Sequence, residues 1–228
     1  MICLLQARTS SKRLPKKVLK KIFNKSILER VIFRIKKSKE VKKIIVTTST
    51  SSSDDKIVSI CKKNKISFYR SNLNNVFLRY FYTIKHYNIP NFVRITADSP
   101  LIDPGIIDKA VKIFKKKRIH IVTNTFRRSY PKGQSVEVID SKLILNNLNL
   151  IKQTRNKKFK EHITSYFYKF NNKFQIYNFN LNENLQNINL SVDTKEDFKL
   201  IKKIIEKTND RFTNMKILVR IQKKILEG

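Results

Sequence analysis

The stretch ICLLQARTSSKRLPKK, residues 2–17, decides the class of fold. Its apolar run, residues 2–5, has the composition of a short buried strand. A loop with five basic side chains and three hydroxyls follows, in the place where many nucleotide-binding folds keep glycines. We call residues 6–17 the basic loop. It has two interpretations, a phosphate cradle built from charge or a solvated loop in a lysine-rich protein.

Outward from this stretch, apolar runs alternate with amphipathic segments. We expect further strands at residues 44–46, 66–69 and 92–96, and helices at 27–35, 57–61, 75–87 and from Pro104 onward. Ser26 is expected to cap the first helix, and Ser53 or Asp54 the second. Apolar strands between helices predict an α/β fold with a mostly parallel central sheet and helices on both faces. Ligands bind such sheets beyond the carboxyl ends of the strands.

The second half has a different pattern. YPKGQSVEVID (130–140) alternates apolar and polar residues, as an antiparallel strand does. Helical stretches follow at 143–151 and 162–170, then a strand at 174–179 and an asparagine-rich surface loop or edge hairpin at 178–189. LSVDTKEDFKLIKKIIEK (190–207) joins a short apolar run to a helix that Asp193 or Thr194 can cap. No domain boundary is visible, so residues 1–228 are expected to form one domain with an antiparallel arm.

The composition excludes several classes of protein. Glycine stands only at Gly105, Gly133 and Gly228, which leaves neither a Walker A loop nor a GxGxxG turn. No apolar run approaches the roughly 18 residues of a membrane span, and residues 2–5 are too short for a signal peptide. We therefore expect a cytoplasmic protein without membrane insertion. Cys3 and Cys61 are isolated, so we expect buried or neutral thiols instead of a disulfide framework or zinc site.

The net charge of +33 would ordinarily indicate a nucleic-acid or anionic-membrane partner. The lysines are spread over the whole chain and accompany abundant asparagine and isoleucine, a drift that an AT-rich coding sequence would produce. A basic nucleic-acid-binding protein, the non-enzyme alternative, predicts aromatic residues interleaved with a localised basic face. The diffuse lysines argue against nucleic acid as a partner.

Two aspartates favour the phosphate interpretation of the basic loop. Asp98 follows an expected strand in VRITADSP, and Asp193 follows the apolar run of LSVDTKED. Two carboxylates at the ligand edge of a parallel sheet make an oxygen site for Mg²⁺, which bridges to substrate phosphates. Either aspartate taken alone is more often a helix cap. His162, next to Glu161, either binds a sugar by a hydrogen bond or satisfies a helix end.

Several motifs together resemble one family. QARTSSKRLPKKVL is similar to the N-terminal signature of the CMP-sugar synthetases, approximately A-R, two small residues, S/T/K-R-L-P-G-K and an apolar pair. RITADSPLIDPGIID, YPKGQSVEV, EHITSYF and SVDTKEDFKLI follow in the order expected of the spore-coat polysaccharide protein SpsF branch of the cytidylyltransferases. The resemblance covers roughly residues 2–205, and acylneuraminate and 3-deoxy-manno-octulosonate cytidylyltransferases are related to this branch.

The resemblance implies a nucleotide-diphospho-sugar transferase fold of GT-A-like type and a homodimer, with an arm at about residues 124–190 that pairs subunits and shapes the sugar pocket. Such enzymes transfer CMP from CTP to a sugar, often a sugar acid, and release pyrophosphate. By position, Arg8, Lys17 and Asp98 would be catalytic, and Asp98 and Asp193 would bind Mg²⁺. The same comparison implies that the substrate-binding residues are Ser10, Ser11, Arg13, Arg79, Glu137 and His162.

The chain departs from the family pattern at three positions. Lys16 replaces the loop glycine, Ser135 replaces a carboxylate of G-L-D-V-E-V, and Leu78 replaces the aspartate before Arg79. The last two changes lie where base or sugar is expected to bind, so they bear on the acceptor more than on the reaction. A glycosyltransferase of the same fold is the alternative enzyme. Retention of R-L-P-x-K favours triphosphate chemistry, because a glycosyltransferase has no γ-phosphate to hold.

Overall fold

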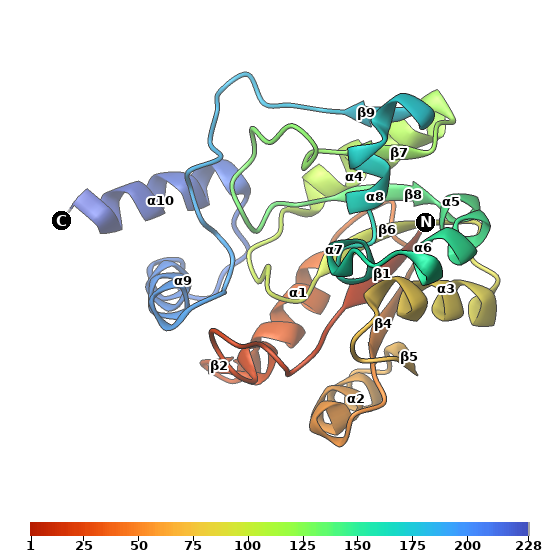
Figure 1. Ribbon diagram of the computed structural model, residues 1–228. Helices are drawn as coiled ribbons and strands as arrows, with labels where there is room; N and C mark the ends of the chain where they lie inside the picture. The colour runs from red at the N-terminus through yellow and green to blue at the C-terminus, as the bar shows by residue number, and fades with distance from the viewer. Residues whose placement is uncertain (228) are drawn as a thin grey trace.

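A seven-stranded sheet forms the centre of the protein in the computed structural model, which describes residues 1–227 (Figure 1). The strand order is β5-β4-β1-β6-β8-β7-β9. The strands are β1 (Ile2–Gln6), β4 (Lys43–Ser49), β5 (Ser67–Ser71), β6 (Asn91–Thr96), β7 (Ile121–Thr123), β8 (Glu137–Asp140) and β9 (Ile176–Asn178). β1 pairs in parallel with both β4 and β6, so the strand that leads into the basic loop is central.

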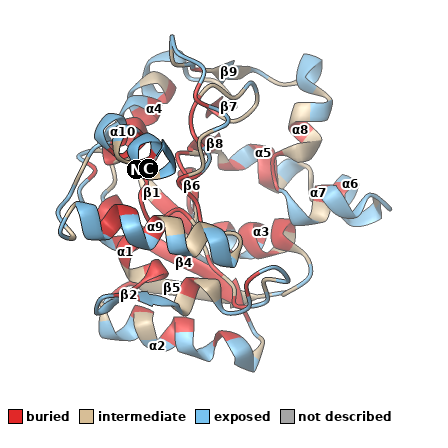
Figure 2. Ribbon diagram, turned by 90° about the vertical axis from the view of Figure 1, so that its left-hand side faces the viewer, coloured by how far each residue is buried: buried red, intermediate tan, exposed pale blue. Residues whose placement is uncertain are grey.

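Helices cover both faces of the sheet, as the sequence predicts. The α-helices are α1 (Ile27–Ile35), α2 (Asp55–Lys63), α3 (Val76–Tyr87), α4 (Pro104–Lys117), α5 (Ser141–Asn146), α6 (Leu148–Gln153), α7 (Lys157–Glu161), α8 (Ser165–Lys169), α9 (Lys195–Lys207) and α10 (Met215–Glu227). Short 3₁₀ helices lie at η1 (Lys17–Leu19), η2 (Ser52–Asp54) and η3 (Asn171–Lys173). Figure 2 shows the buried strands in red, between helices whose outer sides are pale blue.

The period of two along β1 divides the apolar core into two clusters. Cys3 and Leu5 belong to the cluster that includes side chains of α1, α2, α4, α9 and α10, whereas Leu4 belongs to the one with α3 and α5 to α8. All three side chains are fully buried. A strand with both faces covered has to be apolar throughout, which explains the uninterrupted run at residues 2–5.

The capping residues expected from the sequence can be compared with the observed helix starts. Ser26 and Thr194 cap α1 and α9, and each forms a reciprocal capping box with the third helical residue, Glu29 and Asp197 respectively. The expectation that Ser53 or Asp54 caps α2 is wrong, because α2 has no side-chain cap. The Asp54 carboxylate instead accepts hydrogen bonds from the basic loop and from the end of β4.

The second half of the chain enters the same sheet. β8, within the stretch expected to be antiparallel, pairs antiparallel with both β6 and β7, and β9 pairs in parallel with β7. The apolar run at residues 190–192 is not a strand, so a loop, and not a strand end, leads to Asp193. The hairpin of β2 (Lys21–Ile22) and β3 (Lys25–Ser26) and the helix α10 extend the expected set of elements.

Two exclusions drawn from composition can be compared with the structure. Within residues 1–227, no helix combines the length and the apolar character that a membrane crossing requires. Cys3 and Cys61 are both buried free cysteines, as expected. Burial raises the pKa of the Cys61 thiol to about 12, so it stays protonated at neutral pH.

Candidate active site

A cleft of about 800 Å³ lies where β1 and β6 end at their carboxyl termini. This volume suits a nucleotide-sized ligand. The basic loop supplies half of the polar lining residues. The others come from β6 and its end, the segment between β5 and α3, the arm and the residues before α9. The polar lining residues are Gln6, Arg8, Ser10, Ser11, Lys12, Arg13, Lys17, Asn74, Arg94, Thr96, Asp98, Glu161, His162 and Asp193. The structure therefore brings eight of the ten predicted site residues to one cleft and leaves Arg79 and Glu137 outside its lining.

Thr9 gives the basic loop its shape. Its carbonyl oxygen accepts hydrogen bonds from the backbone N–H groups of Ser11 and Lys16, both at 2.9 Å, so the loop closes on itself. Leu14 is buried beneath the loop and anchors it to the core. Lys16 has φ 57° and ψ 24°, the left-handed conformation that favours glycine. The glycine of the family pattern thus corresponds to a real backbone requirement, which a lysine meets here.

Lys17 joins the two predicted carboxylates. Its Nζ lies 2.9 Å from Asp98 Oδ2 and 2.7 Å from Asp193 Oδ1. Arg13 adds a second cation, with its guanidinium 3.2 Å from Asp193 Oδ2. Burial lowers the pKa of Lys17, but the two carboxylates outweigh burial and hold that pKa above its ordinary value. Burial likewise raises the pKa of Asp98, and Lys17 more than compensates, so the carboxyl is ionised at neutral pH.

Main-chain contacts bring Asp193 to the cleft. The Val192 N–H donates to the Asp98 carbonyl oxygen at 2.8 Å, so the two aspartate-bearing segments are joined directly. The Asp193 N–H donates to Asp197 Oδ2 at 2.9 Å, which fixes the residue at the start of α9. Asp193 thus reaches the predicted place through a loop and a helix start, although no strand precedes it.

The two carboxylates fit a hard cation. One oxygen of Asp98 and one of Asp193 already converge on a single positive atom, the Lys17 Nζ. Among residues 1–227, no group of three or more His, Cys, Asp and Glu side chains is arranged to hold a metal. A fully protein-coordinated site is therefore not offered in this part of the chain. The donor set suits Mg²⁺, which in nucleotide sites takes one or two carboxylates and completes its shell with phosphates and water.

Behind the cleft lies a buried ion pair that sequence reasoning missed. Arg94 lines the cleft and pairs with Glu137, which is 3% exposed and also accepts a hydrogen bond from the Tyr168 hydroxyl. A further N–H of Arg94 donates to Gln6 Oε1 at 3.2 Å. Burial raises the pKa of Glu137, and Arg94 outweighs burial, so the pKa lies below its ordinary value. Glu137 lies outside the cleft lining and its carboxylate pairs with Arg94, which does line the cleft, so a substrate contact of Glu137 stays a prediction.

His162 lies in the cleft lining beside Glu161. Its backbone N–H donates to the Lys158 carbonyl oxygen at 2.9 Å and ends α7. The helix end is thus satisfied by the backbone, and the imidazole stays available to the cleft. Burial and then the neighbouring Arg94 lower the pKa of His162, so the ring is neutral at pH 7 and can both donate and accept a hydrogen bond.

Arg79 does not reach the cleft. Its side chain is fully buried and donates to the carbonyl oxygens of Asn72 and Leu73, at 3.1 Å and 2.9 Å. Leu73 and Asn74 line the cleft, so Arg79 holds the backbone of a cleft segment. The expected contact of Arg79 with nucleotide or phosphate is corrected to this indirect one. The motif singled out Arg79 correctly as an arginine of this region, but its burial limits the guanidinium to contacts with the protein backbone.

The comparisons with known proteins agree with this geometry. The sequence model of the cytidylyltransferase family matches residues 2–225. The chain belongs to the cytidylyltransferase family. This cytidylyltransferase is 35% identical over 202 residues to an uncharacterized protein of Methanocaldococcus jannaschii, covering 88% of this chain and 81% of that one. The family model identifies an enzyme that uses CTP in nucleotidyl transfer.

Two further proteins place the cytidylyltransferase among its relatives. It is 24% identical over 217 residues to the spore coat polysaccharide biosynthesis protein SpsF of Bacillus subtilis, covering 92% of this chain and 88% of that protein. Its fold is similar to the solved cytidylyltransferase of Leptospira borgpetersenii serovar Hardjo-bovis, with a TM-score of 0.91 and 31% identity over 99% of this chain and 95% of that one. The expected resemblance and the expected fold are both confirmed.

Proposed function

We propose that this cytidylyltransferase transfers CMP from CTP to a sugar, specifically a sugar acid, and releases pyrophosphate in a Mg²⁺-dependent reaction. The convergence of the basic loop, Asp98 and Asp193 around Lys17 carries the proposal. Cations for three phosphates and carboxylates for a metal then stand in one cleft. The name of the SpsF relative supports a role in making activated sugar for polysaccharide or glycoconjugate synthesis.

In the proposed reaction an acceptor hydroxyl attacks the α-phosphorus of CTP in line. A new oxygen–phosphorus bond forms, the acceptor hydroxyl loses its proton to water, and the bond from the α-phosphorus to the bridging oxygen of the β-phosphate breaks. Arg8 and Lys17 bind the phosphates and stabilise the charge that develops on departing pyrophosphate. Ser10, Ser11 and Arg13 line the same cleft and hold the nucleotide. Positioning and fixed charge supply the acceleration, so no covalent nucleophile is needed.

Asp98 and Asp193 are the residues that would hold Mg²⁺. When bound, the ion supplies Lewis acidity at the phosphate oxygens. Lys17 contacts one oxygen of each carboxylate, which keeps the two side chains directed at a common point. Asp193 also lies where it can orient the attacking hydroxyl.

The acceptor is proposed to bind at the end of the cleft lined by Arg94 and His162. A neutral imidazole suits sugar hydroxyls, and a guanidinium suits the carboxylate of a sugar acid. The arm at about residues 124–190 carries His162 and completes this end of the cleft. By resemblance to the family, the arm also pairs subunits into a homodimer, in an enzyme of the cytoplasm.

Pyrophosphate release tests the proposal. The protein is assayed with each of the four nucleoside triphosphates against a panel of sugar acids and sugar phosphates, with and without Mg²⁺. We expect release with CTP, a sugar acid and Mg²⁺ together. Release that requires another triphosphate would overturn the donor assignment, and full release without a divalent cation would overturn the metal assignment.

Asp98→Asn tests the site itself. The change keeps the shape of the side chain and removes the charge that pairs with Lys17, so turnover is expected to be abolished while the fold is retained. Glu183→Gln is the matched control, since this acid is exposed and lies outside the cleft lining. Near-normal turnover in Asp98→Asn would remove Asp98 from the reaction.

A further inference from the structure

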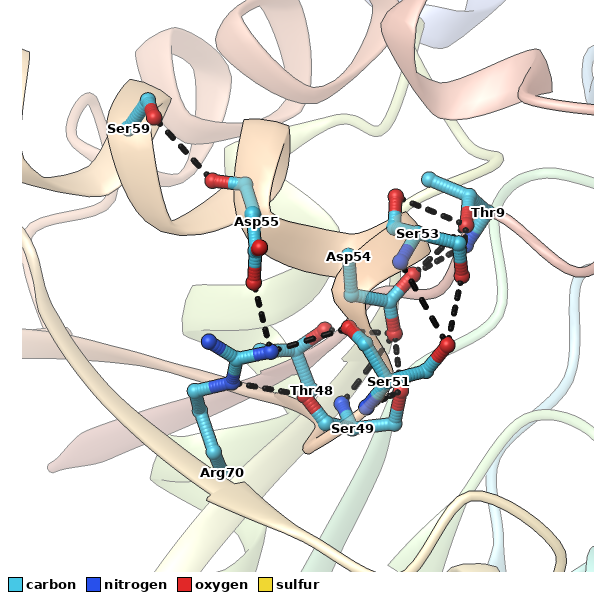
Figure 3. A network of polar contacts seen from close by, with 9 residues as sticks. All are labelled: Thr9, Thr48, Ser49, Ser51, Ser53, Asp54, Asp55, Ser59 and Arg70. Carbon is cyan, nitrogen blue, oxygen red and sulfur yellow. Dashed lines mark hydrogen bonds and ion pairs between the residues drawn. The ribbon is translucent and has the colours of Figure 1, made fainter.

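Asp54 is a buried acid to which the proposed mechanism assigns no role. It lies between β4 and α2, and its side chain is fully buried. Oδ1 accepts hydrogen bonds from the Thr9 N–H at 2.8 Å and the Thr9 hydroxyl at 2.7 Å (Figure 3). Oδ2 accepts from the Ser49 N–H at 3.2 Å, the Ser49 hydroxyl at 2.5 Å and the Thr48 hydroxyl at 3.1 Å. Both oxygens are therefore fully satisfied.

These donors compensate a charge that has no ion-pair partner among the described residues. Within residues 1–227, no lysine, arginine or histidine forms an ion pair with Asp54, whereas the adjacent Asp55 pairs with Arg70 at 2.8 Å. Burial raises the pKa of Asp54, but the hydrogen bonds from Ser49 and Thr9 outweigh burial, and the pKa lies below its ordinary value. An ionised carboxylate accepts stronger hydrogen bonds than a neutral group, so the two hydrogen bonds that Thr9 donates to Asp54 are strong.

Thr9 connects the Asp54 carboxylate to the rest of the basic loop. Its N–H and hydroxyl bind Asp54, while its carbonyl oxygen accepts from Ser11 and Lys16. The segment between Ser11 and Lys16 is thus closed at Thr9. Arg8 precedes this residue directly, and Lys17 follows Lys16 along the chain. Both proposed phosphate ligands are therefore one residue away from a backbone contact that Asp54 fixes.

We propose that Asp54 is a positioning residue for nucleotide binding, which acts through Thr9 to hold the basic loop in its CTP-binding conformation before CTP arrives. The inference rests on the proposed function, because Arg8 and Lys17 are the phosphate ligands that the loop presents. A loop that is already ordered loses less conformational freedom on binding, and the saved entropy appears as affinity. Loss of the Thr9 contact is expected to weaken CTP binding about tenfold, the usual effect of losing one hydrogen bond to a charged group.

The test uses four single variants of the full chain. Thr9→Val removes the hydroxyl and keeps the branched shape, and Thr9→Ser keeps the hydroxyl. Asp54→Asn leaves an amide nitrogen that cannot accept from Ser49. Asp55→Asn is the matched control, because this carboxylate is exposed and makes no contact with Thr9. The dissociation constant of CTP is measured by calorimetry in magnesium buffer, and amide hydrogen exchange over residues 8–17 is measured without nucleotide.

Thr9→Val and Asp54→Asn are expected to raise the dissociation constant of CTP about tenfold and to speed exchange in residues 8–17, while exchange in the core strands is unchanged. Thr9→Ser is expected to restore both properties, and Asp55→Asn to match the wild type. If Asp54→Asn does not fold, Thr9→Val decides, because it leaves the carboxylate in place.

Two outcomes have separate meanings. Equal CTP affinity in wild type and a folded Thr9→Val variant would overturn the positioning role and leave the proposed function intact. Absence of CTP binding by the wild type, with normal folding, would overturn the proposed function, and the positioning role for CTP with it. Weak CTP binding by both Thr9→Val and Thr9→Ser would also refute the inference, because restoring the hydroxyl would then not restore CTP affinity.

Discussion

Replacing Lys16 by glycine is expected to stabilise the protein and to leave CTP binding unchanged. Lys16 has a left-handed backbone, with φ 57°, and its N–H donates to Thr9 in the closure of the basic loop. Its side chain is exposed, is absent from the cleft lining and forms no ion pair within residues 1–227. The substitution therefore changes backbone conformational energy and one exposed charge, and little else.

The magnitude follows from two opposing terms. A non-glycine residue in the left-handed region costs roughly 1–2 kcal/mol. Glycine recovers this cost, but it raises the entropy of the unfolded chain, which opposes folding by roughly 0.5–1 kcal/mol. The Lys16→Gly variant should thus gain about 0.75 kcal/mol in the free energy of unfolding, the middle of a range of roughly 0–1.5 kcal/mol. In a chain of this size that gain raises Tm by about 2 °C.

The assay compares Lys16→Gly with Lys16→Ala by calorimetric Tm and by urea unfolding. Alanine removes the same charge and keeps the left-handed strain, so it separates charge from conformation. Both variants should bind CTP within about twofold of the wild type, because an exposed charge outside the cleft is largely screened. A Lys16→Gly variant no more stable than Lys16→Ala would refute the argument from backbone strain. Equal loss of CTP affinity in both would show that the Lys16 charge does reach the triphosphate.

Three further predictions concern the buried charges. Arg94→Met strips Glu137 of its cation and should cost roughly 3–5 kcal/mol of stability, read from the urea midpoint; an unchanged midpoint would contradict the pairing. Lys17→Met should raise the pKa of Asp98, measured by carboxyl ¹³C NMR, because Lys17 is the main group that holds it low. The pKa values of Asp54 and Glu137 in the folded protein lie below their unfolded values. Their contribution to stability is therefore complete above about pH 5 and is lost as the pH falls through the folded pKa values. A Tm that increases when the pH is lowered from 5 to 3 would contradict this.

Periodicity was sufficient to predict most of the sheet and its helices. The central strands β1 and β4 are buried on both faces, so their apolar runs are continuous. The capping residues Ser26 and Thr194 mark helix starts through purely local contacts. The basic loop and Asp98 could be placed at one sheet edge for the same reason. A parallel sheet directs the ends of β1 and β6 to the same side.

Long-range contacts were beyond the reach of sequence. Glu137 and Arg94 are paired because β8 lies antiparallel against β6, with these two residues opposite each other. The alternating pattern predicts an antiparallel strand, but it contains neither the neighbour of that strand nor the register. One signal was present, since Arg94 is a charge inside an otherwise apolar strand, and such a residue requires a buried partner. Asp193 was predicted at the right edge for a wrong structural reason, because the backbone contact of Val192 replaces the expected strand.

That backbone contact has a consequence for how the sequence can change. The hydrogen bond from the Val192 N–H to the Asp98 carbonyl oxygen joins main-chain atoms, which any residue other than proline can supply on the donor side. Replacement of surface side chains by lysine, asparagine or isoleucine leaves this main-chain link unchanged. The approach of the two carboxylates is thus insulated from changes in side-chain composition, in a chain with a net charge of +33.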